Sequence, residues 1–134
     1  MASTLNPYLV LDGTCRQAME FYQSVLGGEL DISTFGESGV PGVDPDGIMH
    51  AQLTTADGHV IMGSDTGGMA LQPGDTVGMS LSGDDALLAD VFAKLADGGQ
   101  VVVPFERQMW GDDYGQVRDR FGVVWHVNRA SGAA

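Results

Sequence analysis

The sequence has very little cysteine and very little positive charge. Its single cysteine, Cys15, excludes an intramolecular disulfide and a cysteine-rich zinc site. Six lysines and arginines stand against eighteen aspartates and glutamates, which gives a formal net charge of −12. A chain with this charge repels phosphate backbones and anionic membranes, so we expect neither a nucleic acid nor a membrane as its partner.

Long apolar runs are also absent from the sequence. No stretch is long enough to span a bilayer, and the first residues carry no basic segment of the kind that opens a secretory signal, so we expect a cytoplasmic protein. A length of 134 residues with 43% hydrophobic residues suits one domain with its own core. Twenty glycines punctuate the chain without forming a repeat, which favours a turn-rich α+β or β-rich fold over a helical bundle.

The first half of the sequence predicts one strand, one helix and three further strands. The first strand, 5–11, leads into a helix over 14–26, where Thr14 and Gln17 suggest a capping box and Gly27-Gly28 suggests the stop. The three later strands are expected at 29–35, 48–55 and 59–64, with the tight turn Asp57-Gly58 between the last two.

The second half repeats this order. A strand at 76–82 leads into a helical segment within 83–99, which Asp84 or Asp85 can cap and Gly98-Gly99 can end. Strands are expected at 100–105, 114–119 and 123–128. The sequence therefore predicts a single α+β domain over 1–134, built from βαβββ modules at 5–64 and 76–128 with a linker at 65–75.

Alternation along the expected strands separates an apolar face from a mixed face. In 123–128, for example, Val123, Trp125 and Val127 alternate with Val124, His126 and Asn128. The apolar faces must be covered by the amphipathic helices. The mixed faces then form either a half-solvated antiparallel sheet or the lining of a ligand pocket, and alternation alone does not separate these two interpretations.

Three segments of the chain resemble the vicinal-oxygen-chelate superfamily, which includes glyoxalase I, bleomycin-resistance proteins and extradiol dioxygenases. They are "NPYLVLDGTCRQAMEFY", "MHAQLTTADGHVIMGSD" and "MWGDDYGQVRDRFGVVW", and they are closest to the PhnB-like branch. The resemblance covers residues 5 to 128. It implies a cupped eight-stranded mixed sheet, completed in a homodimer, with the mixed strand faces lining the cup. It implies no single reaction, because members of this superfamily share a scaffold and not a chemistry.

The resemblance also locates the positions at which metal-dependent members keep their ligands. These positions fall near Asn6, Met62, Gly78 and His126. Only the histidine is a good ligand for a divalent ion, since glycine has no side chain and a thioether is a poor ligand for a hard metal. We therefore expect no complete metal site and no cofactor.

The preferred hypothesis is a protein that binds a small apolar or aromatic molecule in the cup. The expected ligand-binding residues come from the mixed strand faces and from the loop before the seventh strand: Tyr8, His50, Gln52, Trp110, Tyr114 and His126. These residues also have structural interpretations. Histidines in strands often serve only as hydrogen-bonding partners within the fold, and Trp110 can close the end of the core or contact a dimer partner. We expect His126 to pair with a ligand or with a neighbour such as Asn128 or Ser80.

An enzyme is the alternative hypothesis. In that case His126 and His50, with a third ligand that the sequence does not reveal, would hold a divalent metal in a lyase, isomerase or dioxygenase. Cys15 falls in the first turn of the first helix, where a helix dipole can lower the pKa of a thiol, but we expect a buried structural thiol there.

Overall fold

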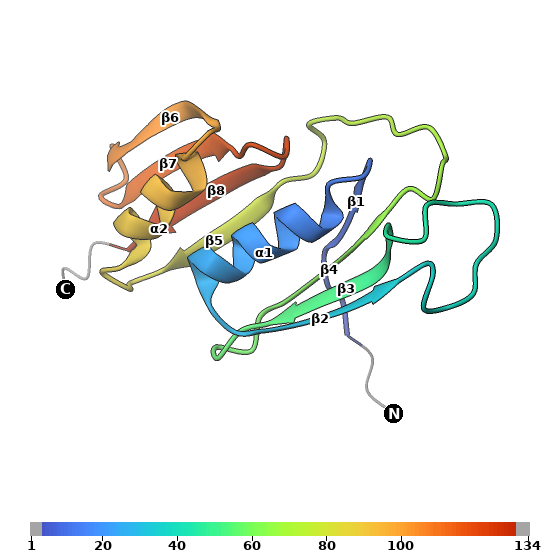
Figure 1. The fold of residues 1–134 in the computed structure, drawn as a ribbon. Helices are drawn as coiled ribbons and strands as arrows, with labels where there is room; N and C mark the ends of the chain where they lie inside the picture. Colours follow the sequence, from blue (N-terminus) through green and yellow to red (C-terminus); the bar gives the residue numbers. More distant parts are fainter. Residues whose placement is uncertain (1–3, 131–134) are drawn as a thin grey trace. The chain divides into compact units, whose positions relative to one another are not determined.

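The computed structural model describes residues 4–130 and shows two βαβββ modules (Figure 1). The elements of the first module are β1 (Tyr8–Leu11), α1 (Cys15–Leu26), β2 (Glu29–Thr34), β3 (Ile48–Thr54) and β4 (Val60–Asp65). Those of the second are β5 (Met79–Gly83), α2 (Leu88–Ala96), β6 (Gln100–Arg107), β7 (Asp113–Arg118) and β8 (Val124–Arg129). The predicted α+β fold with this order of elements is confirmed. The chain divides into two compact units between Gln72 and Pro73, one for each module.

Each module forms a four-stranded mixed sheet with the same strand order. The first is ordered β1-β4-β3-β2 and the second β5-β8-β7-β6. In both, the first strand runs parallel to the last, and the other pairs are antiparallel. The register repeats as well: Tyr8 pairs with Met62 as Ser80 pairs with His126. Position 62 of the first module therefore corresponds to position 126 of the second.

Helix α1 is held by an apolar face and by a cap that the sequence does not suggest. Its buried side chains are Cys15, Ala18, Met19, Tyr22 and Val25. Their spacing of three and four residues places them on one face of a helix. The predicted capping box is wrong, because Thr14 stands at the N-cap and makes no side-chain cap hydrogen bond. Instead, Oδ1 of Asp65, the last residue of β4, accepts a hydrogen bond of 3.0 Å from the backbone N–H of Cys15.

Helix α2 begins at Leu88, later than the sequence pattern alone indicates. Oδ1 of Asp85 accepts a hydrogen bond of 2.9 Å from the backbone N–H of Leu87, which holds the preceding residues in a turn. Such short-range bonds from aspartate compete with helical hydrogen bonds, and this explains the late start. The buried residues Leu88, Phe92 and Leu95 then face the sheet.

Paired glycines follow both helices, as the sequence predicts. Gly27 and Gly98 both have φ of +74°, the left-handed conformation that glycine adopts readily at a helix end. Gly28 and Gly99 have a further role, because a Cβ atom at these positions would overlap the carbonyl oxygens of Thr54 and Arg118 respectively. Both modules thus use a second glycine to bring the chain against the end of the third strand.

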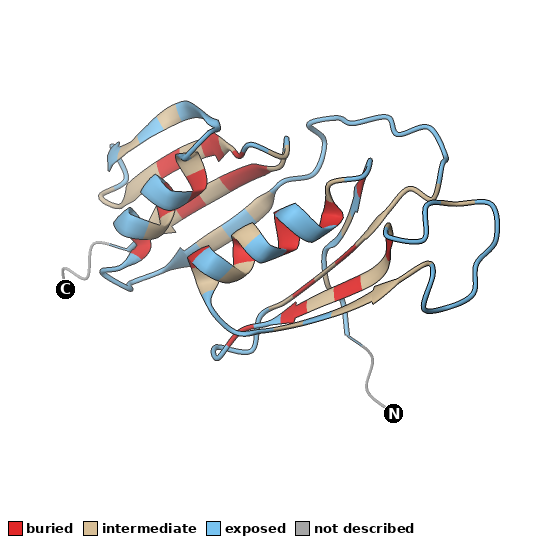
Figure 2. Cartoon of the chain, viewed as in Figure 1, coloured by how far each residue is buried: buried red, intermediate tan, exposed pale blue. Residues whose placement is uncertain are grey.

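The cores lie between each helix and its own sheet, and burial alternates along the strands (Figure 2). In β8, Trp125 and Val127 are buried, whereas His126 and Asn128 are only half-buried. A Cβ atom at Gly115 in β7 would touch Phe92 of α2, so the odd positions of β7 face the helix. Tyr114 and Gln116 therefore lie on the opposite, mixed face, as the alternation predicts.

A buried carboxylate organises the turn between β7 and β8. Oδ1 of Asp119, which is 3% exposed, accepts hydrogen bonds from the backbone N–H groups of Phe121 and Val123, and its Oδ2 accepts one of 2.9 Å from Nε1 of Trp125. The corresponding residue of the first module is Thr55, whose hydroxyl accepts a bond from the N–H of His59. Both turns are therefore stabilised by a buried polar side chain.

Candidate functional site

In the first module, a tyrosine and a histidine meet on the mixed face of the sheet. The hydroxyl of Tyr8 on β1 lies 3.3 Å from Nδ1 of His50 on β3, and the ring centroids are 5.8 Å apart. Tyr8 is 48% exposed and His50 is half-buried, so both rings are accessible. Gln52, two residues further along β3, donates instead to the hydroxyl of Thr54 at 3.4 Å.

The second module contains a shorter tyrosine–histidine contact. The hydroxyl of Tyr114 on β7 lies 2.7 Å from Nδ1 of His126 on β8, and the two rings are stacked with an interplanar angle of 27°. We expected His126 to pair with a ligand or with a neighbour such as Asn128 or Ser80, and the neighbour that the structure places at its Nδ1 is Tyr114. Tyr114 lies diagonally across the strands from His126, because the register pairs it with Asn128.

Trp110 completes this cluster from the loop before β7. Its ring packs edge-on against Tyr114 at a centroid distance of 5.8 Å, and its Nε1 donates to Oδ1 of Asn128 at 3.4 Å. Nδ2 of Asn128 in turn donates to Asp112 at 3.0 Å. Trp110 remains 56% exposed, so an aromatic face is held in place and open to the surroundings.

Neighbouring polar side chains form a row across three strands of the second sheet. The register places His126 between Ser80 on β5 and Gln116 on β7. Within residues 4–130, no hydrogen bond is made by the side chains of Ser80 and Gln116, or by Nε2 of His126. We call Ser80, Trp110, Tyr114, Gln116, His126 and Asn128 the aromatic–polar face.

The structure also tests whether the chain fits the metal that the resemblance implies. The expected positions were Asn6, Met62, Gly78 and His126, whereas the register places Tyr8 opposite Met62 and Ser80 opposite His126. Each of these two sets contains a single strong metal ligand, His126. Gly78 lies under the imidazole, since a Cβ atom there would be 3.1 Å from Nε2 of His126. In the described part of the chain, no three His, Cys, Asp or Glu side chains are grouped so as to hold a metal ion. At these positions the described residues therefore offer a divalent ion one strong ligand, His126.

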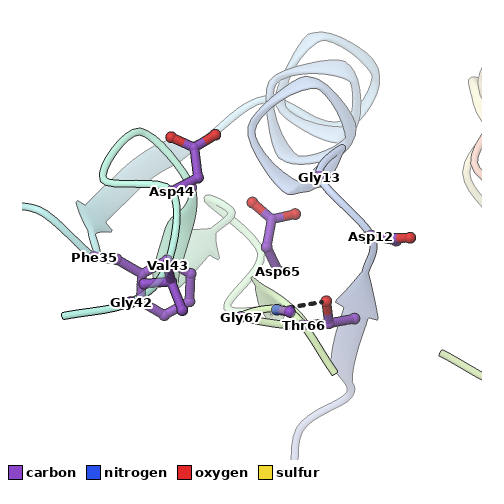
Figure 3. A pocket seen from close by; sticks show the side chains of 11 residues that line it. Asp12, Gly13, Phe35, Gly42, Val43, Asp44, Asp65, Thr66 and Gly67 are labelled. Carbon is purple, nitrogen blue, oxygen red and sulfur yellow. Dashed lines mark hydrogen bonds between the residues drawn. The ribbon is translucent and has the colours of Figure 1, made fainter. Parts of the chain in front are cut away.

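A cavity of about 340 Å³ lies elsewhere, in the first module near the start of α1 (Figure 3). It is formed by the turn after β1, the loop after β2 and the segment after β4, and in Figure 3 the carboxylate of Asp65 lies between Asp44 and Gly13. This cavity is not predicted by the sequence patterns described above. Its only signal was the glycine-rich composition of segments that we interpreted as a loop and a linker.

Cys15, the first residue of α1, is fully buried. Burial, with a smaller contribution from the nearby Asp65 carboxylate, raises the pKa of its thiol to about 12. The thiol therefore stays protonated at neutral pH and is a poor nucleophile. The expectation of a structural thiol agrees with this geometry.

The order of helices and strands gives this chain a fold of the vicinal-oxygen-chelate type. A glyoxalase family protein from Bacillus cereus has the same fold, with a TM-score of 0.65 at 15% identity over 98% of this chain and 96% of its own. A PhnB protein from Bacillus cereus matches with a TM-score of 0.80 at 22% identity, over 96% of this chain and 100% of its own.

More specifically, the chain belongs to the family described as 3-demethylubiquinone-9 3-methyltransferase, whose model matches residues 3–128. Protein YjdN of Escherichia coli (strain K12) is 31% identical over 92% of this chain and 93% of its own length. Protein PA1353 of Pseudomonas aeruginosa is 34% identical with a TM-score of 0.87, over 96% of this chain and 98% of its own. Neither helix of residues 4–130 has the length and apolar character needed to cross a membrane.

Proposed function

We propose that this chain is a PhnB-like member of its superfamily that binds a small apolar or aromatic molecule without a complete metal site. The aromatic–polar face of the second module is the proposed binding surface, with Trp110, Tyr114 and His126 as ligand contacts. Tyr8, His50 and Gln52 form a second proposed contact cluster in the first module. The family description names a methyltransferase. The function proposed here is argued instead from the side chains of this chain.

The observation that carries the proposal is the set of unpaired hydrogen-bonding groups beside an aromatic pair, in which Trp110 is exposed and Tyr114 is half-buried. Trp110 and Tyr114 present apolar ring surface, and Nε2 of His126 lies next to them without a hydrogen-bond partner in residues 4–130. Ligand sites commonly combine apolar area with a few polar groups that orient the bound molecule.

The proposal is tested with the bicyclic probes 1-tetralone and tetralin, using thermal shift and tryptophan fluorescence. Binding that raises the melting temperature supports the proposal, because a ligand that binds only the folded state stabilises it. Trp110→Ala should weaken binding by roughly tenfold, the loss of one aromatic contact. Met109→Ala is the matched control, since Met109 is the neighbouring residue and is 98% exposed. Equal affinity of both variants would contradict the assigned surface.

The alternative remains a divalent-metal-dependent lyase, isomerase or dioxygenase that uses His126 and His50. One observation favours it, namely that Nε2 of His126, a common metal-binding atom of histidine, has no hydrogen-bond partner among the described residues. Metal analysis of the purified protein decides between the two functions. Stoichiometric zinc, iron, nickel or manganese that is lost in His126→Ala would support the enzyme.

A homodimer and a cytoplasmic location are part of the same proposal. In each module the first and second strands form the sheet edges, and β1 exposes Tyr8 and Val10. A second copy would cover such apolar side chains. Light scattering coupled to size-exclusion chromatography tests the dimer, and fractionation of producing cells tests the location.

A further inference from the structure

We propose that Tyr114 fixes His126 in the tautomer with its hydrogen on Nε2, and that the aromatic–polar face therefore binds its ligand through a carbonyl-type acceptor oxygen. This inference rests on the proposed function, because it names the class of molecule that the same face takes. It also makes Tyr114 a positioning residue for the histidine, in addition to being an aromatic contact.

The tautomer follows from the chemistry of the short contact. The hydroxyl of Tyr114 and Nδ1 of His126 are 2.7 Å apart, so one of them donates a hydrogen to the other. A phenol is the stronger donor of the two, and an unprotonated imidazole nitrogen is a stronger acceptor than a phenolic oxygen. The phenol hydrogen therefore points to Nδ1. A neutral imidazole carries one N–H group, so the hydrogen of the ring lies on Nε2.

The position of Nε2 makes this donor available to a ligand. The imidazole lies over the bare Cα of Gly78, where an added Cβ atom would be 3.1 Å from Nε2, and Gly78 is exposed. Ser80 and Gln116 flank the ring on the neighbouring strands. An oxygen placed at Nε2 would thus accept one hydrogen bond from the ring, with further donors from a hydroxyl and an amide beside it.

The surrounding charges favour a neutral oxygen over an anionic one. Each of the arginines that end β6, β7 and β8 is already paired with a carboxylate: Arg107 and Arg129 form ion pairs with Asp113, and Arg118 forms one with Asp75. Asp112 lies next to Asp113 in sequence and accepts the amide hydrogen of Asn128. With a formal net charge of −12, the chain also repels anions at long range. A ketone, quinone or amide oxygen on an aromatic framework therefore fits better than a carboxylate or a phosphate.

The first module does not offer the same arrangement. There the tyrosine–histidine distance is 3.3 Å, and the residue equivalent to His126 is Met62. The carbonyl-binding assignment accordingly concerns the second module alone.

The tautomer is measured directly by long-range proton–nitrogen NMR of the histidine rings in the free protein. We expect wild-type His126 to show a protonated Nε2 and an unprotonated Nδ1, and Tyr114→Phe to show a mixture of tautomers. Protonated Nδ1 in the wild type would overturn the inference whether or not any probe binds. His126→Gln assigns the signals, and the wild-type spectrum suffices if Tyr114→Phe does not fold.

Ligand choice is measured with 1-tetralone and tetralin, which share a bicyclic frame and differ in one carbonyl group. Wild type should bind 1-tetralone about tenfold more tightly, the effect of one hydrogen bond, and Tyr114→Phe should reduce that ratio to about twofold. Met109→Ala should keep the wild-type ratio. Equal binding of the two probes would overturn this inference and leave the aromatic site intact, whereas binding of neither would overturn the proposed function and this inference with it.

Discussion

Asp65 joins the end of β4 to the beginning of α1 through Cys15. One carboxylate oxygen accepts the backbone N–H of Cys15 at 3.0 Å, and the other accepts that of Ile48, the first residue of β3, at 2.9 Å. A negative charge at this place also interacts favourably with the helix dipole. A single side chain therefore connects three elements of the first module.

Asp65→Ala should lower the free energy of unfolding by about 2–3 kcal/mol, because it removes a helix cap and leaves two backbone N–H groups without their acceptor. Urea denaturation followed by circular dichroism measures this change. The control is Asp12→Ala, an exposed carboxylate on the rim of the same cavity, which should change stability by less than about 0.5 kcal/mol. If Asp65→Ala and Asp12→Ala lost similar unfolding free energy, the effect would come from removing one negative charge and not from removing the helix cap.

Cys15 should make the protein less stable in strongly alkaline solution. The pKa of its thiol is about 12 in the folded chain and 9.0 ordinarily, so the unfolded chain loses the proton first. The protonated thiol therefore contributes to the stability of the folded chain. This contribution is fully present below about pH 9 and is lost as the pH rises toward 12. Denaturation midpoints between pH 8 and 11 should fall more steeply for wild type than for Cys15→Ala. Parallel curves would contradict the raised pKa.

Gly99→Ala should destabilise the second module through steric overlap alone. The new Cβ atom would overlap the carbonyl oxygen of Arg118, and the resulting shift of the backbone should cost about 1–3 kcal/mol. Gly74→Ala is the matched control, because nothing lies within 4 Å of a Cβ atom at that position. The melting temperatures of the two variants measure the difference in stability. An unchanged melting temperature for Gly99→Ala would mean that β6 can move away from β7 without loss of stability.

Asp119→Ala should be among the most damaging single changes in the second module. It removes the acceptor of two backbone N–H groups of the turn and of the buried Trp125 indole. We expect a loss of about 3–4 kcal/mol in unfolding free energy, together with a shift in the emission of the buried tryptophan. Trp125→Phe, which keeps Asp119 and its bonds to the two backbone N–H groups, should cost less. The reverse order of the two losses would contradict this assignment.

The strands, the helices and their buried faces could be predicted because they depend on local patterns. The alternation of Trp125 and Val127 with His126 separates the two faces of β8 without reference to any other strand. The caps were harder to predict, since Asp65 reaches α1 from a strand 50 residues further along the chain. Short-range capping rules cannot detect such a contact.

The contact between Tyr114 and His126 could not be predicted from the sequence. Tyr114 and His126 both fall on the mixed face, yet their contact is diagonal and depends on the register between β7 and β8. One residue of slippage would separate them. The cavity beside Asp65 was missed for a similar reason, because its lining comes from three segments that are distant in sequence.

The matching register of the two sheets has a consequence for how the two mixed faces can differ. Positions that shape the scaffold are the same in both halves, such as Gly27 and Gly98, whereas Met62 in one half corresponds to His126 in the other. Because the backbone pattern is shared, a substitution at position 62 or 126 changes the mixed face of one module alone. His126 gives the second half a polar ring at the position where the first half has a thioether.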